Sequence, residues 1–245
     1  MADDKTPKKK RVSIAGVLLR LVFAGIFWAI VWGGINPDRA IPVGWNPLAP
    51  LRVSDPITPI TQWRFRRTIA DPELCLAALA DAADFEILPD LEKSEQCYIR
   101  PRVDLSSAGS VRVRPVETRC AIALSMAMWA EHSLKPAAIE MGTRLSEIDH
   151  IGSYNCRQMR TTGGGTGRMS THATASAIDI SGFRFENGER IRLIDDWDGS
   201  DAKSTYLRNA KDGACDWFRL TLSPDYNALH ADHFHLQSVG WGGCR

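Results

Sequence analysis

The chain has 245 residues, of which 44% are apolar and 24% are charged, and its formal net charge at pH 7 is +1. These values are ordinary for a globular protein with one sizeable core. They exclude the strongly basic surface that is typical of nucleic-acid-binding domains. Six Lys and Arg against two Asp in residues 1–35 leave the remainder mildly acidic. We therefore expect one main domain and no nucleic-acid partner.

The N-terminal segment has the pattern of a membrane anchor. Lys8-Lys9-Lys10-Arg11 precedes a nearly unbroken apolar run from Val12 to Ile35, in which Arg20 is the only charged residue. The run is long enough to span a bilayer, and the long stem of Arg20 can extend toward the basic flank. Basic residues before a span predict a cytoplasmic N-terminus. We predict a basic cytoplasmic tail over residues 1–11 and a transmembrane signal anchor over 12–35. A cleaved signal peptide is the alternative, but no Ala-x-Ala site follows the run.

Residues 36–61 hold six of the 13 prolines and predict an extended, semi-stiff linker. The main domain is then expected over residues 62–245. Asp71-Pro72-Glu73 has the pattern of a helix start, with a capping aspartate and a proline in the first turn. Further elements are predicted in the following order: strands over 96–103 and 110–115, a helix over 119–133, and a helix from Pro136 to about Leu145.

A glycine-rich stretch over residues 161–167 predicts an irregular loop, which is either a mobile flap or a simple surface loop. It lacks the Gly-Lys-Ser/Thr ending of a phosphate-binding loop. Asn187-Gly188 predicts a two-residue hairpin turn within 183–193, followed by a helix over 201–220 and a strand over 233–239. The predicted fold class is α+β, with helices packed on a small antiparallel sheet.

Imidazole and carboxylate groups cluster in the C-terminal third. His172 and Asp179 are seven residues apart with small residues between them, and His233-Phe234-His235 follows near the C-terminus. Zinc prefers nitrogen and oxygen ligands, and a catalytic site uses three protein ligands. Residues two apart on a strand project from one face. His172, Asp179 and one of the two later histidines are therefore candidate ligands of a single zinc ion.

All six cysteines lie after residue 70 and none forms a Cys-x-x-Cys pair, which indicates disulfides in an oxidising compartment rather than a zinc ribbon. Fifteen pairings are possible. The pair we expect first is Cys215 with Cys244, which would tie the C-terminal tail back to the domain.

These motifs resemble a known family. Ser-x-His-x6-Asp followed by His-x-His is similar to the zinc peptidases grouped around lysostaphin, the D-Ala-D-Ala peptidases and the hedgehog signalling domain. More closely, the stretch from about Cys75 to Cys244 resembles the bacterial extensin-like C-terminal domain. The landmarks are Cys120, Trp129, Ser153-Tyr154-Asn155-Cys156-Arg157, Ser170-Thr171-His172, Asp179, Phe183, Trp197, Cys215 and His230 to Leu236. Related peptidases usually have glycine at the position of Ala175.

The resemblance implies roles for individual residues. His172, Asp179 and His235 would be the zinc ligands, and His233 would orient or deprotonate the attacking water, although the opposite assignment within the 233/235 pair is open. From its chemistry rather than the resemblance, Arg157 is our candidate to stabilise the oxyanion or hold a substrate carboxylate, because arginine donates in a planar fork, unless it forms an ordinary surface salt bridge. Further residues are Ser170 and Tyr154 as substrate-binding residues, with Ser170 alternatively holding the loop. His230 is out of strand parity with His233 and His235, so we expect it to lie behind the ligands.

The resemblance also implies a substrate and a location. A zinc peptidase anchored by residues 12–35 in a bacterial inner membrane, single-pass, with its domain in the periplasm, would meet the stem peptides of peptidoglycan. We expect hydrolysis of amide bonds there, with an endopeptidase preferred to a carboxypeptidase. The alternative is an inactive wall-binding or scaffold domain that retains the fold. A serine hydrolase is disfavoured, because no Gly-x-Ser-x-Gly occurs.

Overall fold

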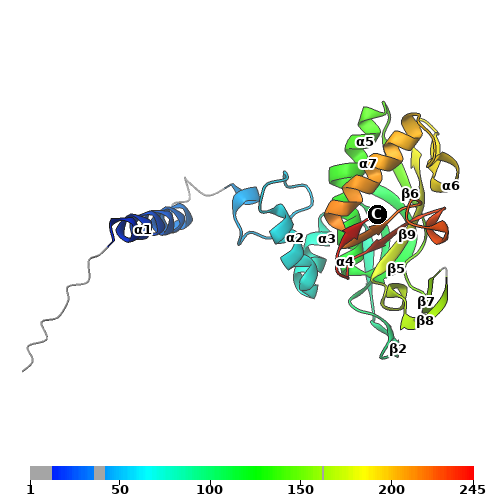
Figure 1. The fold of residues 1–245 in the computed structure, drawn as a ribbon, viewed down its shortest axis with the longest axis horizontal. Helices are drawn as coiled ribbons and strands as arrows, with labels where there is room; N and C mark the ends of the chain where they lie inside the picture. The colour runs from blue at the N-terminus through cyan, green and yellow to red at the C-terminus, as the bar shows by residue number, and fades with distance from the viewer. Residues whose placement is uncertain (1–12, 36–41, 162) are drawn as a thin grey trace, which may run out of the picture. The chain divides into compact units, whose positions relative to one another are not determined.

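The computed structural model describes residues 13–35, 42–161 and 163–245. The chain forms two compact units, residues 1–47 and 48–245, each described by itself. The first unit contains helix α1 (Ile14–Ile35) and a short 3-10 turn (Val43–Trp45) (Figure 1). Within α1, the segment Ile14–Trp32 has a mean hydropathy of 2.3 and is long and apolar enough to cross a membrane. The predicted cytoplasmic tail over 1–11 lies outside the described residues.

The second unit begins at Leu48, inside the segment predicted as a linker. Leu51 and Val53 are buried in the core of the domain. The buried Arg64 side chain donates to the carbonyl oxygen of Pro50 and, at 3.0 Å, to a carboxylate oxygen of Asp55. The later part of the proline-rich segment therefore packs on the domain, because apolar side chains between the prolines reach core positions.

The domain is built on a mixed sheet of nine strands, in the order β1-β4-β5-β6-β9-β12-β11-β13, with β10 paired to β9. The strands are β1 (Phe85–Leu88), β4 (Arg102–Ala108), β5 (Val111–Arg119), β6 (Leu145–Gly152), β9 (Ala177–Phe185), β10 (Arg190–Arg192), β11 (Leu220–Leu222), β12 (Phe234–Gln237) and β13 (Gly243–Cys244). The prediction of α+β is confirmed, but the prediction of a small, antiparallel sheet was wrong. β5 pairs with β6, and β11 with β13, in parallel. The β5 to β6 crossover passes through helices, as parallel neighbours require.

Helices cover the sheet and fill the core. The helices of this unit are α2 (Thr61–Ala70), α3 (Pro72–Ala80), α4 (Cys120–Trp129), α5 (Lys135–Glu140), α6 (Leu193–Asp196) and α7 (Ala202–Trp217). Every residue of α4 except Ala121 is buried. Its last residue, Trp129, contacts the ring of Phe183 on β9 edge-on and donates from Nε1 to the carbonyl oxygen of Ala210 on α7. Figure 1 shows α5 and α7 beside each other over the strands.

Several local predictions are confirmed. Asp71 caps α3 by accepting from the backbone N–H groups of Glu73 and Leu74. Strands β9 and β10 form the predicted hairpin, but the prediction of a two-residue turn was wrong. The turn runs from Phe185 to Arg190, and only Gly188 in it has a positive φ, of 84°. The stretch over 161–167 is not irregular, however. Its described residues contribute to a small hairpin of β7 (Gln158–Thr161) and β8 (Gly164–Met169), because paired backbone groups compensate for the weak strand preference of glycine.

Disulfides join all six cysteines: Cys75 with Cys120, Cys97 with Cys156, and Cys215 with Cys244. The first ties α3 to the start of α4. The second ties β3 (Cys97–Ile99), which pairs with β2 (Leu91–Ser94), to the segment after β6. The third ties α7 to β13, at the place where the sequence led us to expect it.

Candidate metal centre

Three elements bring His172, Asp179 and His235 together. Asp179 lies on β9 and His235 on β12, and the two residues are direct partners in the antiparallel register. Side chains opposite each other in such a pair are close neighbours. His172 lies on a 3-10 turn (Thr171–Thr174), which precedes β9. Ser170 caps this turn by accepting from the backbone N–H of His172.

The three side chains meet in a compact cluster. The distance from His235 Nδ1 to Asp179 Oδ1 is 2.8 Å, and that from His172 Nε2 to Asp179 Oδ2 is 3.2 Å. His172 Nε2 and His235 Nδ1 lie 3.2 Å apart. One ligand atom from each residue lies within 4.8 Å of the others. The two histidines are buried, so water competes weakly for these atoms.

The surroundings fix the orientation of both imidazoles. His172 Nδ1 lies 2.8 Å from the carbonyl oxygen of Ser153. A carbonyl oxygen only accepts, so Nδ1 donates to it, and Nε2 is the ring nitrogen that points at the cluster. The Ser153 hydroxyl is in turn bonded to Thr118 and to the carbonyl oxygen of Ala177. His235 Nε2 lies 2.7 Å from the side-chain amide of Gln237, which leaves Nδ1 facing Asp179.

This donor set fits a cation. His172 Nε2 and a carboxylate oxygen of Asp179 lie 3.2 Å apart, so both atoms could contact one cation. Burial alone would raise the pKa of Asp179, but its hydrogen bonds with His172 and His235 hold that pKa well below the ordinary value. Burial lowers the pKa of His235 despite its contact with Asp179. One carboxylate beside two imidazole rings is the set of ligands that a zinc ion takes.

A second group of histidines adjoins the first. His233 Nε2 lies 3.6 Å from Asp179 Oδ1, and its Nδ1 is 2.8 Å from a carboxylate oxygen of Asp232. His230, His233 and His235 also place ligand atoms within 4.8 Å of one another. His230 ends a 3-10 turn (Ala228–His230) outside the strand, so strand parity does not decide its place relative to the ligands. Burial, with the neighbouring His235 and His233, lowers the pKa of His230 to about 4.

The other predicted site residues are placed differently. Ser170 is buried and caps the His172 turn, which is the loop-holding alternative. The Arg157 guanidinium donates to the carbonyl oxygen of Gln158 at 3.2 Å and, among the described residues, forms no ion pair. The Tyr154 hydroxyl is buried without a hydrogen-bond partner in the described part of the chain. The ammonium of Lys93 lies 5.3 Å from the Tyr154 ring.

Backbone strain is present at Ala175, directly after the His172 turn. Its φ of 47° and ψ of 31° are left-handed, a conformation that disfavours a side chain with Cβ. Ala175 is fully buried, and its N–H donates to the carbonyl oxygen of His172. The chain therefore turns as tightly here as a glycine would allow.

Sequence reasoning missed the residues behind the ligands. Ser153 and Gln237 lie in the motifs that we had singled out, but their contacts depend on how β6 and β12 are placed. Thr118 gave no signal at all, because it meets Ser153 across a separation of 35 residues.

Comparison with known proteins gives one match. The family model described as extensin-like protein C-terminus matches residues 73–245. No curated protein and no solved structure matches the chain.

Proposed function

We propose that this chain, which belongs to the extensin-like protein C-terminus family, is a membrane-anchored zinc peptidase that hydrolyses amide bonds in peptidoglycan stem peptides or their cross-links. The observation that carries the proposal is the convergence of His172, Asp179 and His235 within 4.8 Å. Three protein ligands leave a coordination position for water, as in catalytic rather than structural zinc sites. Bound zinc would supply Lewis acidity and a nucleophile at neutral pH.

His233 supplies the proton acceptor in this proposal. Its Nδ1 faces the carboxylate of Asp232 at 2.8 Å, and an ionised carboxylate only accepts, so Nδ1 carries the proton. The lone pair of Nε2 is then directed toward the cluster, near Asp179. A neutral imidazole held in this tautomer can take a proton at Nε2 and later return it to the leaving amine.

Ser170, Ser153 and Gln237 act as positioning residues. Ser170 holds the turn that carries His172, Ser153 fixes the proton on His172 Nδ1, and Gln237 contacts the outer edge of the His235 ring. Partners of this kind hold metal ligands in orientation and raise metal affinity. Arg157 remains our candidate for contact with substrate, with Tyr154, on the segment that the Cys97–Cys156 disulfide anchors.

Two features support a location outside the cytoplasm. Helix α1 is long and apolar enough to span a membrane, and all six cysteines pair in disulfides, which persist in oxidising compartments. A domain tethered to the outer face of a bacterial inner membrane faces the periplasm. The amide-bonded polymer in the periplasm is the peptide portion of the cell wall.

The test uses the full chain in detergent, loaded with zinc and incubated with isolated wall sacculi. Mass spectrometry of the soluble products should show new peptide ends that disappear with His172→Ala and with a chelator. His150→Gln, which alters a histidine outside the cluster, is the matched control and should retain activity. Unchanged sacculi with stoichiometric zinc and intact disulfides would reject the enzyme in favour of a wall-binding domain.

A further inference from the structure

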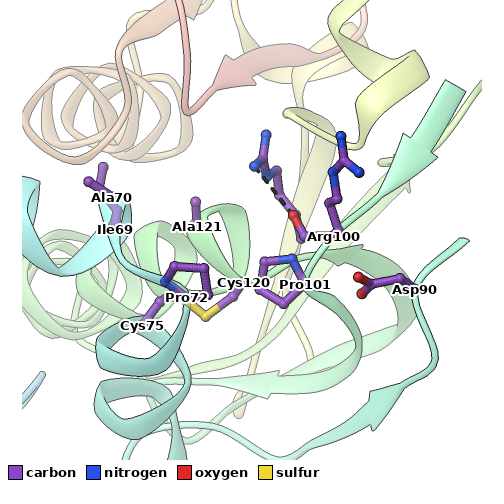
Figure 2. Close-up of a pocket in the computed structure, with 10 residues that line it drawn as sticks. Ile69, Ala70, Pro72, Cys75, Asp90, Arg100, Pro101, Cys120 and Ala121 are labelled. Atoms are coloured by element: carbon purple, nitrogen blue, oxygen red, sulfur yellow. Dashed lines mark hydrogen bonds between the residues drawn. A yellow bond between two sulfur atoms is a disulfide. The ribbon is translucent and has the colours of Figure 1, made fainter. Parts of the chain in front are cut away.

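A cavity of the domain is lined by residues other than His172, Asp179 and His235. It has a volume of about 360 Å³ and is lined by the end of α2, the starts of α3 and α4, the end of β5 and the turn between β1 and β2. Figure 2 shows Pro72 and the Cys75–Cys120 disulfide on one side, with Arg100 and Asp90 on the other. The volume is in the range of small-ligand pockets, and the disulfide makes one wall rigid.

Arg119 lines this cavity, and part of its guanidinium group has no hydrogen-bond partner among the described residues. It donates from Nη1 to Ser176 Oγ at 2.8 Å and from Nη2 to the carbonyl oxygen of Arg100 at 3.3 Å. Its Nε is buried without a partner, and no carboxylate of the described residues is ion-paired with it. Burial lowers the pKa of Arg119, and the charge of Arg100 acts in the same direction. A partly buried guanidinium without a counter-ion is costly, so an anion in the cavity would stabilise it.

Arg100 provides a second guanidinium at the same place. It pairs with Glu92 at 3.1 Å, but both side chains are more than half exposed, so the pair is weak and can exchange for a ligand. Its guanidinium also lies 4.2 Å from the centre of the Tyr98 ring, which restricts where it can move. Two neighbouring guanidinium groups suit bidentate binding of a planar anion.

Asp90 limits the kinds of anion that this cavity can bind. Its exposed carboxylate also lines the cavity and forms no ion pair with any described residue. A negative charge here opposes a dianion such as phosphate, and favours a monoanion that carries a nearby cationic or N–H group. A peptide end with a free carboxylate has this chemistry.

We propose that this cavity binds the free carboxylate of a peptide through Arg119 and Arg100. The site deepens the proposed function and rests on it for the identity of the peptide, which would be a stem peptide of the wall. Arg119 also contacts Ser176, in the segment between His172 and Asp179, and Ser176 donates from its N–H to the carbonyl oxygen of Thr171. The carboxylate site and the His172 turn are therefore joined through Ser176.

The test measures binding by isothermal titration calorimetry with the full chain in detergent and a chelator present. The probes are the dipeptide D-Ala-D-Ala, the same dipeptide with a C-terminal amide, and inorganic phosphate. We expect the free carboxylate form to bind about tenfold or more tightly than the amide, because charged hydrogen bonds are lost in the amide. Binding of phosphate with no binding of the dipeptide would overturn the proposal.

Single arginine substitutions test whether the dipeptide binds in this cavity. Arg119→Lys keeps the charge but loses the planar fork, and should weaken dipeptide binding about tenfold or more. Arg112→Lys, an exposed arginine on the same strand β5, is the matched control and should bind as the parent does. Equal binding by Arg119→Lys, or equal binding of acid and amide, would overturn the site. Since zinc is absent, this result is independent of whether the protein hydrolyses sacculi.

Discussion

His235 and Asp179 lie directly opposite each other on β12 and β9, with 2.8 Å between His235 Nδ1 and Asp179 Oδ1. The sheet thus places two candidate ligands, one nitrogen and one oxygen, beside each other. His172 adds the third candidate from a separate turn, so the cluster depends on both the strand register and the capped turn.

Removing the carboxylate should remove the metal. Asp179→Asn keeps the shape but not the charge, and we expect zinc affinity to fall by more than about 100-fold, beyond what loss of an outer-shell partner causes. Competition with a chromogenic chelator measures the affinity. Asp212→Asn, at an exposed aspartate that contacts Lys211, is the control and should bind zinc normally. Unaltered affinity in Asp179→Asn would remove Asp179 from the ligand set.

Substitution of His233 should lower the catalytic rate without lowering the zinc content. If His233 transfers the proton, His233→Gln lowers kcat by about 100-fold to 10,000-fold while zinc content stays near one per chain. Zinc analysis alongside sacculus digestion provides the measurement. Loss of zinc together with activity would instead make His233 a ligand, which is the reverse assignment within the 233/235 pair.

The strained turn gives a stability prediction. At Ala175, glycine would relieve the left-handed strain of about 1–2 kcal/mol, offset by about 0.5–1 kcal/mol of added backbone entropy in the unfolded chain. Ala175→Gly should therefore be neutral or stabilising by up to about 1.5 kcal/mol. The matched change Ala173→Gly, at an equally buried residue without positive φ, should destabilise. Denaturant unfolding measures the free energy of unfolding of both variants. A larger loss of stability in Ala175→Gly than in Ala173→Gly would contradict backbone strain at Ala175.

Two histidines outside the cluster, His132 and His150, should make the stability of the fold depend on pH. Burial lowers the pKa of His132, against the raising effect of its contact with the Val53 carbonyl, and burial likewise lowers the pKa of His150. The unfolded chain then takes up protons near the ordinary value of 6.5 while the folded chain does not. Stability is present above that pH and falls below it, by up to about 1.4 kcal/mol per pH unit for each histidine.

The measurement for this prediction is the free energy of unfolding from pH 7.5 to 5.5, with zinc removed. His132→Gln should show a shallower decline than the parent chain. Arg245→Lys, at the exposed C-terminus, is the comparison and should follow the parent curve. A decline of equal slope in His132→Gln would show that His132 titrates alike in both states.

From residue type and spacing, the sequence predicted that His172 and Asp179 would lie beside one histidine of the 233/235 pair, and the structure brings these side chains together. Only the resemblance to the zinc peptidases singled out His235. The parallel pairing of β5 with β6 could not be predicted, because the helices between the two strands do not determine which strand pairs with β5. The place of His230 could not be predicted from strand parity, because parity applies only inside a strand and the chain turns before β12 begins. Ser153 and Thr118 meet through tertiary packing, which local patterns do not encode.

X-ray absorption at the zinc edge of the zinc-loaded full chain tests the central claim most directly. The account predicts one zinc per chain with two imidazole nitrogens and oxygen ligands at about 2.0–2.2 Å, and a changed spectrum in His172→Ala. A closed shell of four protein ligands, or sulfur ligation, would contradict a catalytic centre built from His172, Asp179 and His235.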